Sequence, residues 1–282
     1  MSKRADYIAK IEIDGLWGRR NILWTLNPDV NILSGINGIG KSTIINSAIG
    51  SLQHMTNLSL LEKDDADVKI TFSPEDAAYI PFNVIRSFDR PLLRSDLLDK
   101  LADNRVKTEL DWQLYQLQRQ YLDYQVNIGN RIIEVLQSSI PEAQAEAAKL
   151  SEAKIQFQDI VDELFSDTHK IIDRKSNEIE LIQGDDRLEP YCLSSGEKQI
   201  LVILLTVLVQ DHKHCALLMD EPEVSLHIEW QQQLITLVRK INPNVQVILT
   251  THSPAVIMNG WMDKVTEVSD ISEDPLLDKD DG

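Results

Sequence analysis

The sequence predicts an α/β fold with a β-sheet core and an inserted helical hairpin, and three observations lead to this prediction. Both ends of the chain alternate short apolar runs, typical of buried strands, with segments that carry one apolar helical face. A glycine-rich loop near the N-terminus lies between one such run and one such segment. Between about residues 91 and 176 the apolar residues instead recur at gaps of four and three, which indicates packed helices.

The N-terminal part supplies strands around the glycine-rich loop. Period-two alternation predicts strands at residues 8–13 and 68–72, and a further strand is expected within residues 83–90. The run at 31–34, directly before the loop, is short and mostly apolar, as a buried strand would be. Residues 43–49, directly after the loop, have an apolar helical face.

The loop itself, residues 35–42, has the pattern G-x-x-x-x-G-K-S of a P-loop, in the strand–loop–helix context that this motif requires. Its glycines let backbone N–H groups turn inward around phosphate oxygens, and the helix start adds further donors. Lys41 would reach the β- and γ-phosphates, and the Ser42 hydroxyl would bind Mg²⁺. The predicted nucleotide-binding residues are Gly35, Ile36, Asn37, Gly38, Ile39, Gly40, Lys41, Ser42 and Thr43.

The middle of the chain predicts an antiparallel helical hairpin whose two arms carry matching apolar seams. Residues 139–142 fit a capping box that restarts the helix between the arms, and each arm would extend at most ~45 Å. The hairpin is either a partner-docking or clamp element or a plain helical subdomain packed on the sheet. The seam residues are Leu110, Leu114, Leu117, Tyr121, Tyr124, Ile128, Ile132 and Val135, then Leu150, Ala153, Phe157, Ile160 and Leu164.

Three motifs follow a short strand expected at residues 178–182. Residues 193–199 begin a helix that Ser194 or Ser195 can cap, and such a helix end attracts anions. The apolar run at 215–219 ends in the adjacent carboxylates Asp220 and Glu221, and the run at 245–251 ends in His252. At a strand end the chain turns, so Asp220 can reach a Mg²⁺ shell while Glu221 acts as a general base on water.

In this order the motifs resemble the ABC ATPase superfamily, in the form of its SMC-like and RecF-like members. The resemblance covers roughly residues 5–95 and 177–265 and implies an ABC-type P-loop ATPase with a mixed β-sheet core, using ATP and Mg²⁺. It makes Asp220 the Walker B aspartate and His252 the switch histidine that contacts the γ-phosphate. It also implies a head-to-tail homodimer in which Ser194, Ser195 and Gly196 bind the γ-phosphate held by the partner's P-loop.

Some positions depart from the superfamily pattern. Ser225-Leu226-His227 falls where the D-loop is expected, with His227 in place of the common Asp. No glutamine follows the strand expected at 83–90, so Ser87 or Asp89 is the candidate for the Q-loop role. Trp17 and Trp24 precede the P-loop and are either adenine contacts or core residues of the first strands.

The resemblance implies four regions and a function. The ATPase lobe comprises residues 1–95 and 177–268, the inserted hairpin 96–176, and an acidic tail 269–282. The E-P-E-x-x-L-H pattern is similar to ATPases of bacterial anti-phage systems of the Septu-like, retron-associated and OLD-like kinds. We therefore expect an ATPase that regulates a separate effector, such as a nuclease or toxin. The alternatives are a DNA repair or recombination ATPase, an ABC transporter subunit and a non-hydrolysing ATP sensor.

Charge and composition limit which partners and which cellular location are expected. The net charge of −17 over 282 residues argues against broad DNA binding by one chain alone, although a local groove on a dimer remains open. No apolar run approaches the roughly 20 residues of a membrane span, and no signal peptide is expected, so the predicted location is the cytoplasm. Cys192 and Cys215 are expected to be small core residues. The one sustained basic stretch comprises Arg86, Arg90, Arg94, Lys100, Arg105 and Lys107.

Overall fold

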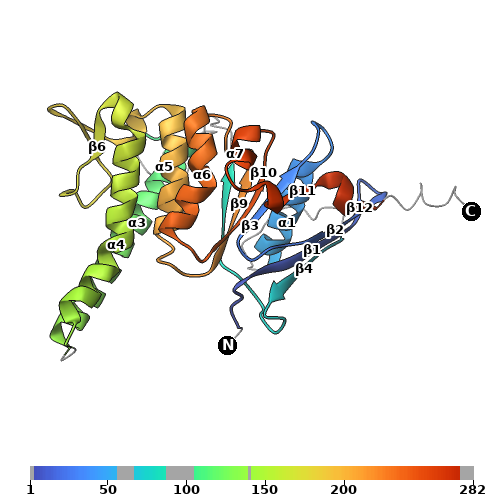
Figure 1. Ribbon diagram of the computed structural model, residues 1–282, viewed down its shortest axis with the longest axis horizontal. Coiled ribbons are helices and arrows are strands. Elements are labelled where there is room, and N and C mark those ends of the chain that lie inside the picture. The colour runs from blue at the N-terminus through green and yellow to red at the C-terminus, as the bar shows by residue number, and fades with distance from the viewer. Residues whose placement is uncertain (1–2, 56–66, 87–104, 139–140, 274–282) are drawn as a thin grey trace, which may run out of the picture.

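A computed structural model describes residues 3–55, 67–86, 105–138 and 141–273. Its strands form a five-stranded sheet, a four-stranded sheet and a three-stranded sheet. The five-stranded sheet stands in the centre, with a layer of helices on one side and the four-stranded sheet on the other (Figure 1). The predicted α/β fold class is confirmed, and the central sheet separates two hydrophobic cores.

The five strands of the central sheet are all parallel, in the order β11-β3-β10-β9-β5. Asp220 is in register with Thr250 on one side and with Arg86 on the other, so these strands end together. Residues that follow the strands therefore gather at one edge of the sheet. The strands are β3 Val30–Ser34, β5 Phe82–Arg86, β9 Cys215–Asp220, β10 Val245–Thr250 and β11 Val265–Glu267.

The four-stranded sheet is antiparallel and contains both strands predicted from period-two alternation. Its last strand lies within residues 269–282, the expected acidic tail. The chain stays in the fold through Glu273, because residues 272–273 pair with residues 21–22. The strands are β1 Tyr7–Leu16, β2 Arg20–Thr25, β4 Asp67–Ser73 and β12 Ser272–Glu273.

Alternate residues of the central strands face different cores. In β9, Leu217 and Met219 belong to the core on the helical side, while Ala216 and Leu218 belong to the core on the α1 side. The helix α1, Lys41–Met55, packs between the two large sheets. Because successive side chains of a strand point to opposite faces, Asp220 follows Leu218 and lies on the face that α1 covers.

Three helices of the C-terminal part complete the ATPase lobe. The helix α5 is apolar on all sides, and every residue from Glu197 to Leu208 is buried, as expected of a helix enclosed by other elements. It packs against the helical hairpin and against α6. The helices are α5 Ser195–Leu208, α6 Ile228–Ile241 and α7 Pro254–Met258.

The predicted hairpin consists of α3, Glu109–Gln137, and α4, Ala143–Leu164. All six of the first seam residues, from Leu110 to Ile128, are buried, whereas Ile132 is only partly buried. The first part of α3 packs on α5, and the ends of both arms extend beyond α5 and α6 (Figure 1). The hairpin is thus packed on α5 at its base and projects from the ATPase lobe at its tip.

Two local predictions need correction. Ser139 lies outside the described residues, and α4 begins after Glu142 without a side-chain capping hydrogen bond, so the predicted capping box does not start it. A capping box occurs instead at Thr108, before α3. The strand expected at 178–182 begins at Leu181, in a sheet of β6 Lys170–Ile172, β7 Leu181–Gln183 and β8 Asp186–Leu188.

The cysteine prediction is half right. Cys215 is buried in β9, and burial raises the pKa of its thiol to about 12. Cys192, by contrast, is exposed in the turn before α5, so it is not a core residue. Its position two residues before the helix cap, rather than inside the apolar part of the helix, explains this exposure.

Candidate functional site

The phosphate loop connects the end of β3 to the start of α1, as the motif predicts. Gly38 and Gly40 have φ angles of +80° and +109°, which residues with a Cβ rarely adopt. Gly40 has a second reason to lack a side chain, because an added Cβ would lie 2.1 Å from the ring of Trp17. The loop is therefore built on backbone geometry that only glycine allows.

Lys41 lies inside the loop with its side chain directed back along it. Its Nζ donates to the carbonyl oxygens of Gly35 at 2.9 Å and Ile36 at 3.2 Å, and the residue is 4 % exposed. Burial lowers the pKa of the Lys41 ammonium, and the negative charges of Glu221, Asp220 and Glu223 oppose this shift. The ammonium is thus bonded to carbonyl oxygens, which are weaker acceptors than phosphate oxygens.

Ser42 and Asp220 meet although they are far apart in sequence. The Ser42 hydroxyl donates to Asp220 Oδ1 at 2.9 Å, and the Thr250 hydroxyl donates to the same oxygen at 2.6 Å. A hydroxyl and a carboxylate are the hard oxygen ligands that suit Mg²⁺, which usually takes one or two protein ligands plus phosphate. No group of three or more His, Cys, Asp or Glu in the described part of the chain could hold a metal ion. This donor set fits Mg²⁺ bound together with a nucleotide.

Glu221 leaves the direction of β9 immediately after Asp220. Its φ of +48° is unusual for a residue with a side chain, and its backbone N–H donates to the carbonyl and hydroxyl oxygens of Thr250, both at 3.1 Å. The turn brings Glu221 Oε1 to 3.2 Å from His252 Nε2. The other nitrogen of this ring, Nδ1, lies 3.5 Å from Lys41 Nζ. His252 therefore bridges the expected base and the phosphate-loop lysine.

The signature segment forms the N-terminus of α5. Ser194 is the N-cap: its side chain accepts from the Glu197 N–H, and the Glu197 carboxylate accepts from the Ser194 N–H. Ser195 is exposed at the first position of the helix. A Cβ added to Gly196 would lie 2.4 Å from the carbonyl oxygen of Ser225, so the signature packs directly against the expected D-loop.

Two buried ion pairs anchor this helix end. Glu197 accepts from Lys170 at 2.7 Å, and Lys198 lies 2.8 Å from Asp111 of α3. Burial acts to raise the pKa of Glu197, but the hydrogen bonds from Lys170 and Ser194 prevail and lower it. Since removing one partner of a buried pair leaves an uncompensated charge, the helix end is fixed to the base of the hairpin.

Within one chain the signature is not bonded to the phosphate loop. In the described residues, no hydrogen bond or ion pair joins Ser194, Ser195 or Gly196 to residues 35–42. Polar contacts of a single chain therefore connect the P-loop, Asp220, Glu221 and His252 but do not include the signature.

The two tryptophans have different surroundings. Trp24 is 1 % exposed and lies in the core, so it is a core residue of β2. Trp17 is 49 % exposed in the turn between β1 and β2, where its ring lies against Gly40 and 5.8 Å from the Arg20 guanidinium. Trp17 is thus the aromatic residue that borders the phosphate loop.

Sequence reasoning missed the residues that hold the strand ends together. Glu223 is 7 % exposed, and its Oε1 accepts hydrogen bonds from the Thr251 hydroxyl and the His252 N–H. Gln231, in α6, forms hydrogen bonds with the loop that follows β9 and with the loop that follows β10. The second Glu of the E-P-E pattern marks Glu223 as a candidate functional residue. Its hydrogen-bond partner Thr251, however, is 28 positions away along the chain. The Q-loop candidates Ser87 and Asp89 lie outside the described residues.

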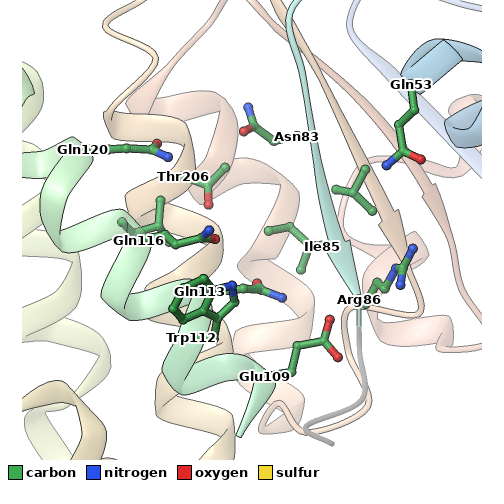
Figure 2. A pocket seen from close by; sticks show the side chains of 12 residues that line it. Gln53, Asn83, Ile85, Arg86, Glu109, Trp112, Gln113, Gln116, Gln120 and Thr206 are labelled. Atoms are coloured by element: carbon green, nitrogen blue, oxygen red, sulfur yellow. The ribbon is translucent and has the colours of Figure 1, made fainter. Parts of the chain in front are cut away.

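A separate cavity of about 350 Å³ lies beside β5. Figure 2 shows Asn83 and Ile85 of β5 opposite Trp112, Gln113 and Gln116 of α3. None of the predicted nucleotide-binding residues lines it. The side-chain amides and the single Arg–Glu combination of its lining are not the chemistry of a triphosphate site.

Comparison with solved structures supports the fold alone. The chain is similar to an Smc head solved bound to the C-winged helix domain of ScpA, with a TM-score of 0.52 and 16 % identity over 90 % of this chain and 91 % of that one. Among the described helices, none combines the length and the apolar character that a membrane span requires.

Comparison with characterised proteins adds relatives from bacterial systems. The Septu protein PtuA of Bacillus thuringiensis is 24 % identical, over 95 % of this chain and 76 % of PtuA. The "Retron Ec83 probable ATPase" of Escherichia coli is 39 % identical over 75 residues, which are 23 % of this chain and 14 % of that protein. The "Retron Vc95 probable ATPase" of Vibrio cholerae is 24 % identical over 32 % of this chain and 20 % of that protein.

A family match covers most of the chain, including the phosphate loop, Walker B and switch segments described above. Residues 30–259 match the family described as "AAA_21: AAA domain, putative AbiEii toxin, Type IV TA system". This span contains Lys41, Ser42, Asp220, Glu221 and His252. The chain therefore belongs to the AAA_21 family of AAA domains.

Proposed function

We propose that this protein hydrolyses ATP in a head-to-tail homodimer and uses the cycle to regulate a separate effector. The observation that carries the hydrolysis proposal is the meeting of five functional side chains at one sheet edge. Lys41 and Ser42 come from the phosphate loop, and Asp220 and the Glu221–His252 pair come from the ends of β9 and β10. Such groups can hold a triphosphate, orient a water and accept its proton.

In the proposed reaction a water oxygen attacks the γ-phosphorus of ATP while the bond from that phosphorus to the β,γ-bridging oxygen breaks, giving ADP and phosphate. Glu221 accepts the proton of the attacking water. His252 holds the Glu221 carboxylate through Nε2 and contacts the γ-phosphate. Lys41 exchanges the carbonyl oxygens of Gly35 and Ile36 for phosphate oxygens, which are stronger acceptors for an ammonium. When bound at Ser42 and Asp220, Mg²⁺ supplies positive charge to the phosphate oxygens.

The dimer proposal rests on the signature. Ser195 is exposed, and among the described residues no hydrogen bond or ion pair joins the α5 N-terminus to its own phosphate loop. A second copy arranged head to tail would bring this helix end to the γ-phosphate, where unpaired N–H donors favour negative charge. Each site would then contain Lys41 and Glu221 of one chain and the α5 N-terminus of the other.

The effector proposal rests on the relatives. The match to Septu protein PtuA spans nearly the whole chain, and two other relatives carry the name "probable ATPase" of a retron. We place the protein in a bacterial anti-phage system, in the cytoplasm where ATP is available, acting with a nuclease or toxin. Nucleic acid would be bound through this partner or in a groove of the dimer. Purification of the natively expressed complex, with every chain and nucleic acid identified, tests this part.

The hydrolysis proposal is tested with the phosphate-loop lysine. We expect purified protein to release phosphate from ATP in the presence of Mg²⁺, and Lys41→Ala to reduce the rate by at least about 10²-fold, because the triphosphate loses its main positive partner. Arg86→Ala removes a positive charge from the same sheet edge without touching the phosphate loop and serves as the matched control. Equal rates for wild type and Lys41→Ala would reject the site.

Trp17 is proposed as the adenine platform. We expect Trp17→Ala to weaken ATP binding roughly 5- to 100-fold, the range typical of base–aromatic stacking, while Trp17→Phe keeps a ring and most of the affinity. Binding of tripolyphosphate, which has no base, should be the same in wild type and Trp17→Ala. Titration calorimetry measures the affinity for ATP and for tripolyphosphate in wild type and in both variants. A loss of tripolyphosphate affinity equal to the loss of ATP affinity would show that Trp17 only shapes the loop.

A further inference from the structure

We propose that Glu223 is a positioning residue for His252, a role that rests on the proposed ATPase function. Glu223 lies two residues after Glu221, in the turn that follows β9. Among the described residues, its side chain makes no hydrogen bond or ion pair with the phosphate loop or with Asp220. Its contacts are instead with the segment that follows β10, where His252 is located.

The contact is a two-donor clamp on one carboxylate oxygen. Glu223 Oε1 accepts from the Thr251 hydroxyl and, at 3.1 Å, from the backbone N–H of His252. Glu223 is 7 % exposed and Thr251 is fully buried. Buried hydrogen bonds to a charged acceptor are short and about twice as strong as neutral ones, so this clamp fixes the backbone from which the imidazole projects.

The second oxygen of this carboxylate shows that the clamp has a cost. Glu223 Oε2 is buried and has no hydrogen-bond partner among the described residues. A buried polar atom without a partner is destabilising, and a packed apolar side chain at this position would avoid the cost. The arrangement is therefore better explained by what Oε1 holds than by stability.

Gln231 of α6 also joins the turn after β9 to the segment after β10. Its Nε2 donates to the Leu226 carbonyl oxygen at 2.9 Å and to the Glu223 carbonyl oxygen at 3.3 Å. Its Oε1 accepts from the Ser253 hydroxyl at 2.6 Å. The turn after β9 and the segment after β10 are thus joined on both flanks of His252.

The clamp affects function because Glu221 and Glu223 are close together in the chain. Glu221 and Glu223 belong to one turn, so holding His252 to Glu223 also sets the distance from His252 to Glu221. Without the clamp, the imidazole keeps its chemistry but loses its fixed place between Glu221 and Lys41. A displacement of about 1 Å in such an arrangement can cost on the order of 10²-fold in rate.

A double-mutant cycle tests whether Glu223 acts through His252. We expect Glu223→Ala and His252→Ala each to lower kcat on the order of 10²-fold with little change in KM, and the double variant to be no slower than His252→Ala alone. Glu223→Gln keeps an accepting oxygen and should restore most of the rate. Glu229→Ala, an exposed acid in α6, is the matched control. Additive losses in the double variant, or an inactive Glu223→Gln, would overturn the assignment.

Hydrogen exchange provides a readout that needs no activity. We expect residues 251–253 to exchange faster in Glu223→Ala and in the milder Thr251→Val than in wild type, while Thr251→Ser and Glu229→Ala leave them unchanged and β9 stays protected in all five proteins. Unchanged exchange at 251–253 in both loss variants rejects the clamp. An inactive wild type with this exchange pattern would reject the ATPase proposal but not the clamp.

Discussion

Glu221→Gln is expected to lower the rate of ATP hydrolysis by about 10²- to 10⁴-fold, the usual contribution of a general base, while ATP still binds. Gln has the shape of Glu and keeps an oxygen that can accept from His252 at the observed 3.2 Å. It lacks the negative charge and cannot accept the proton of water. Lys41, Ser42 and Asp220 are untouched, so the contacts that hold the triphosphate should survive.

The same variant should accumulate as an ATP-bound dimer. In the proposed cycle ATP joins two chains and hydrolysis separates them, so a chain that binds but does not hydrolyse stays joined. Multi-angle light scattering with ATP and Mg²⁺ measures the mass, and a phosphate-release assay measures the rate. Glu75→Gln makes the same charge change at an exposed turn and should behave as wild type. Wild-type turnover by Glu221→Gln would mean that another group is the base.

The residues at the centre of the site were predictable because each follows a distinctive local pattern. Lys41 and Ser42 belong to a complete P-loop, and Asp220 and His252 each end an apolar strand. Their meeting follows from topology: β3, β9 and β10 are adjacent parallel strands, and parallel strands end at the same edge of a sheet. The apolar seam of α3 was predictable for a similar reason, since its spacing alone defines one helix face.

What could not be predicted depends on contacts between distant segments. The partners of Glu223 lie in the loop that follows β10. Gln231 lies on α6, which reaches both this loop and the loop that follows β9. No local sequence pattern marks the contacts of either residue. Trp17 and Trp24 are alike in sequence terms, but one lies in a turn and the other on the inner face of β2. The pairing of β12 with β2 could not be predicted, because β12 contains only two residues, Ser272 and Glu273, and has no sequence signal.

Ser195→Arg is expected to abolish hydrolysis while leaving ATP binding by the isolated chain unchanged. Ser195 is exposed at the first position of α5, and among the described residues it makes no hydrogen bond to its own phosphate loop. A long side chain there would block the approach of the helix end to a phosphate held by a second chain. Ser195→Ala removes the hydroxyl without adding bulk and should lose far less. Loss of ATP binding in Ser195→Arg would contradict the two-chain site.

Mixing inactive variants separates a shared site from a site within one chain. A dimer of Ser195→Arg with Lys41→Ala contains one site with an intact phosphate loop and an intact signature, so an equal mixture should recover about one quarter of the wild-type rate if dimers form at random. Lys41 and Glu221 of one chain belong to the same site. In a dimer of Lys41→Ala with Glu221→Gln each site therefore keeps one defect, and the mixture should recover no activity. Recovery in the first mixture alone requires that each active site be assembled from two chains. If neither mixture recovers, each chain completes its site alone, and Ser195 acts only through the stability of α5.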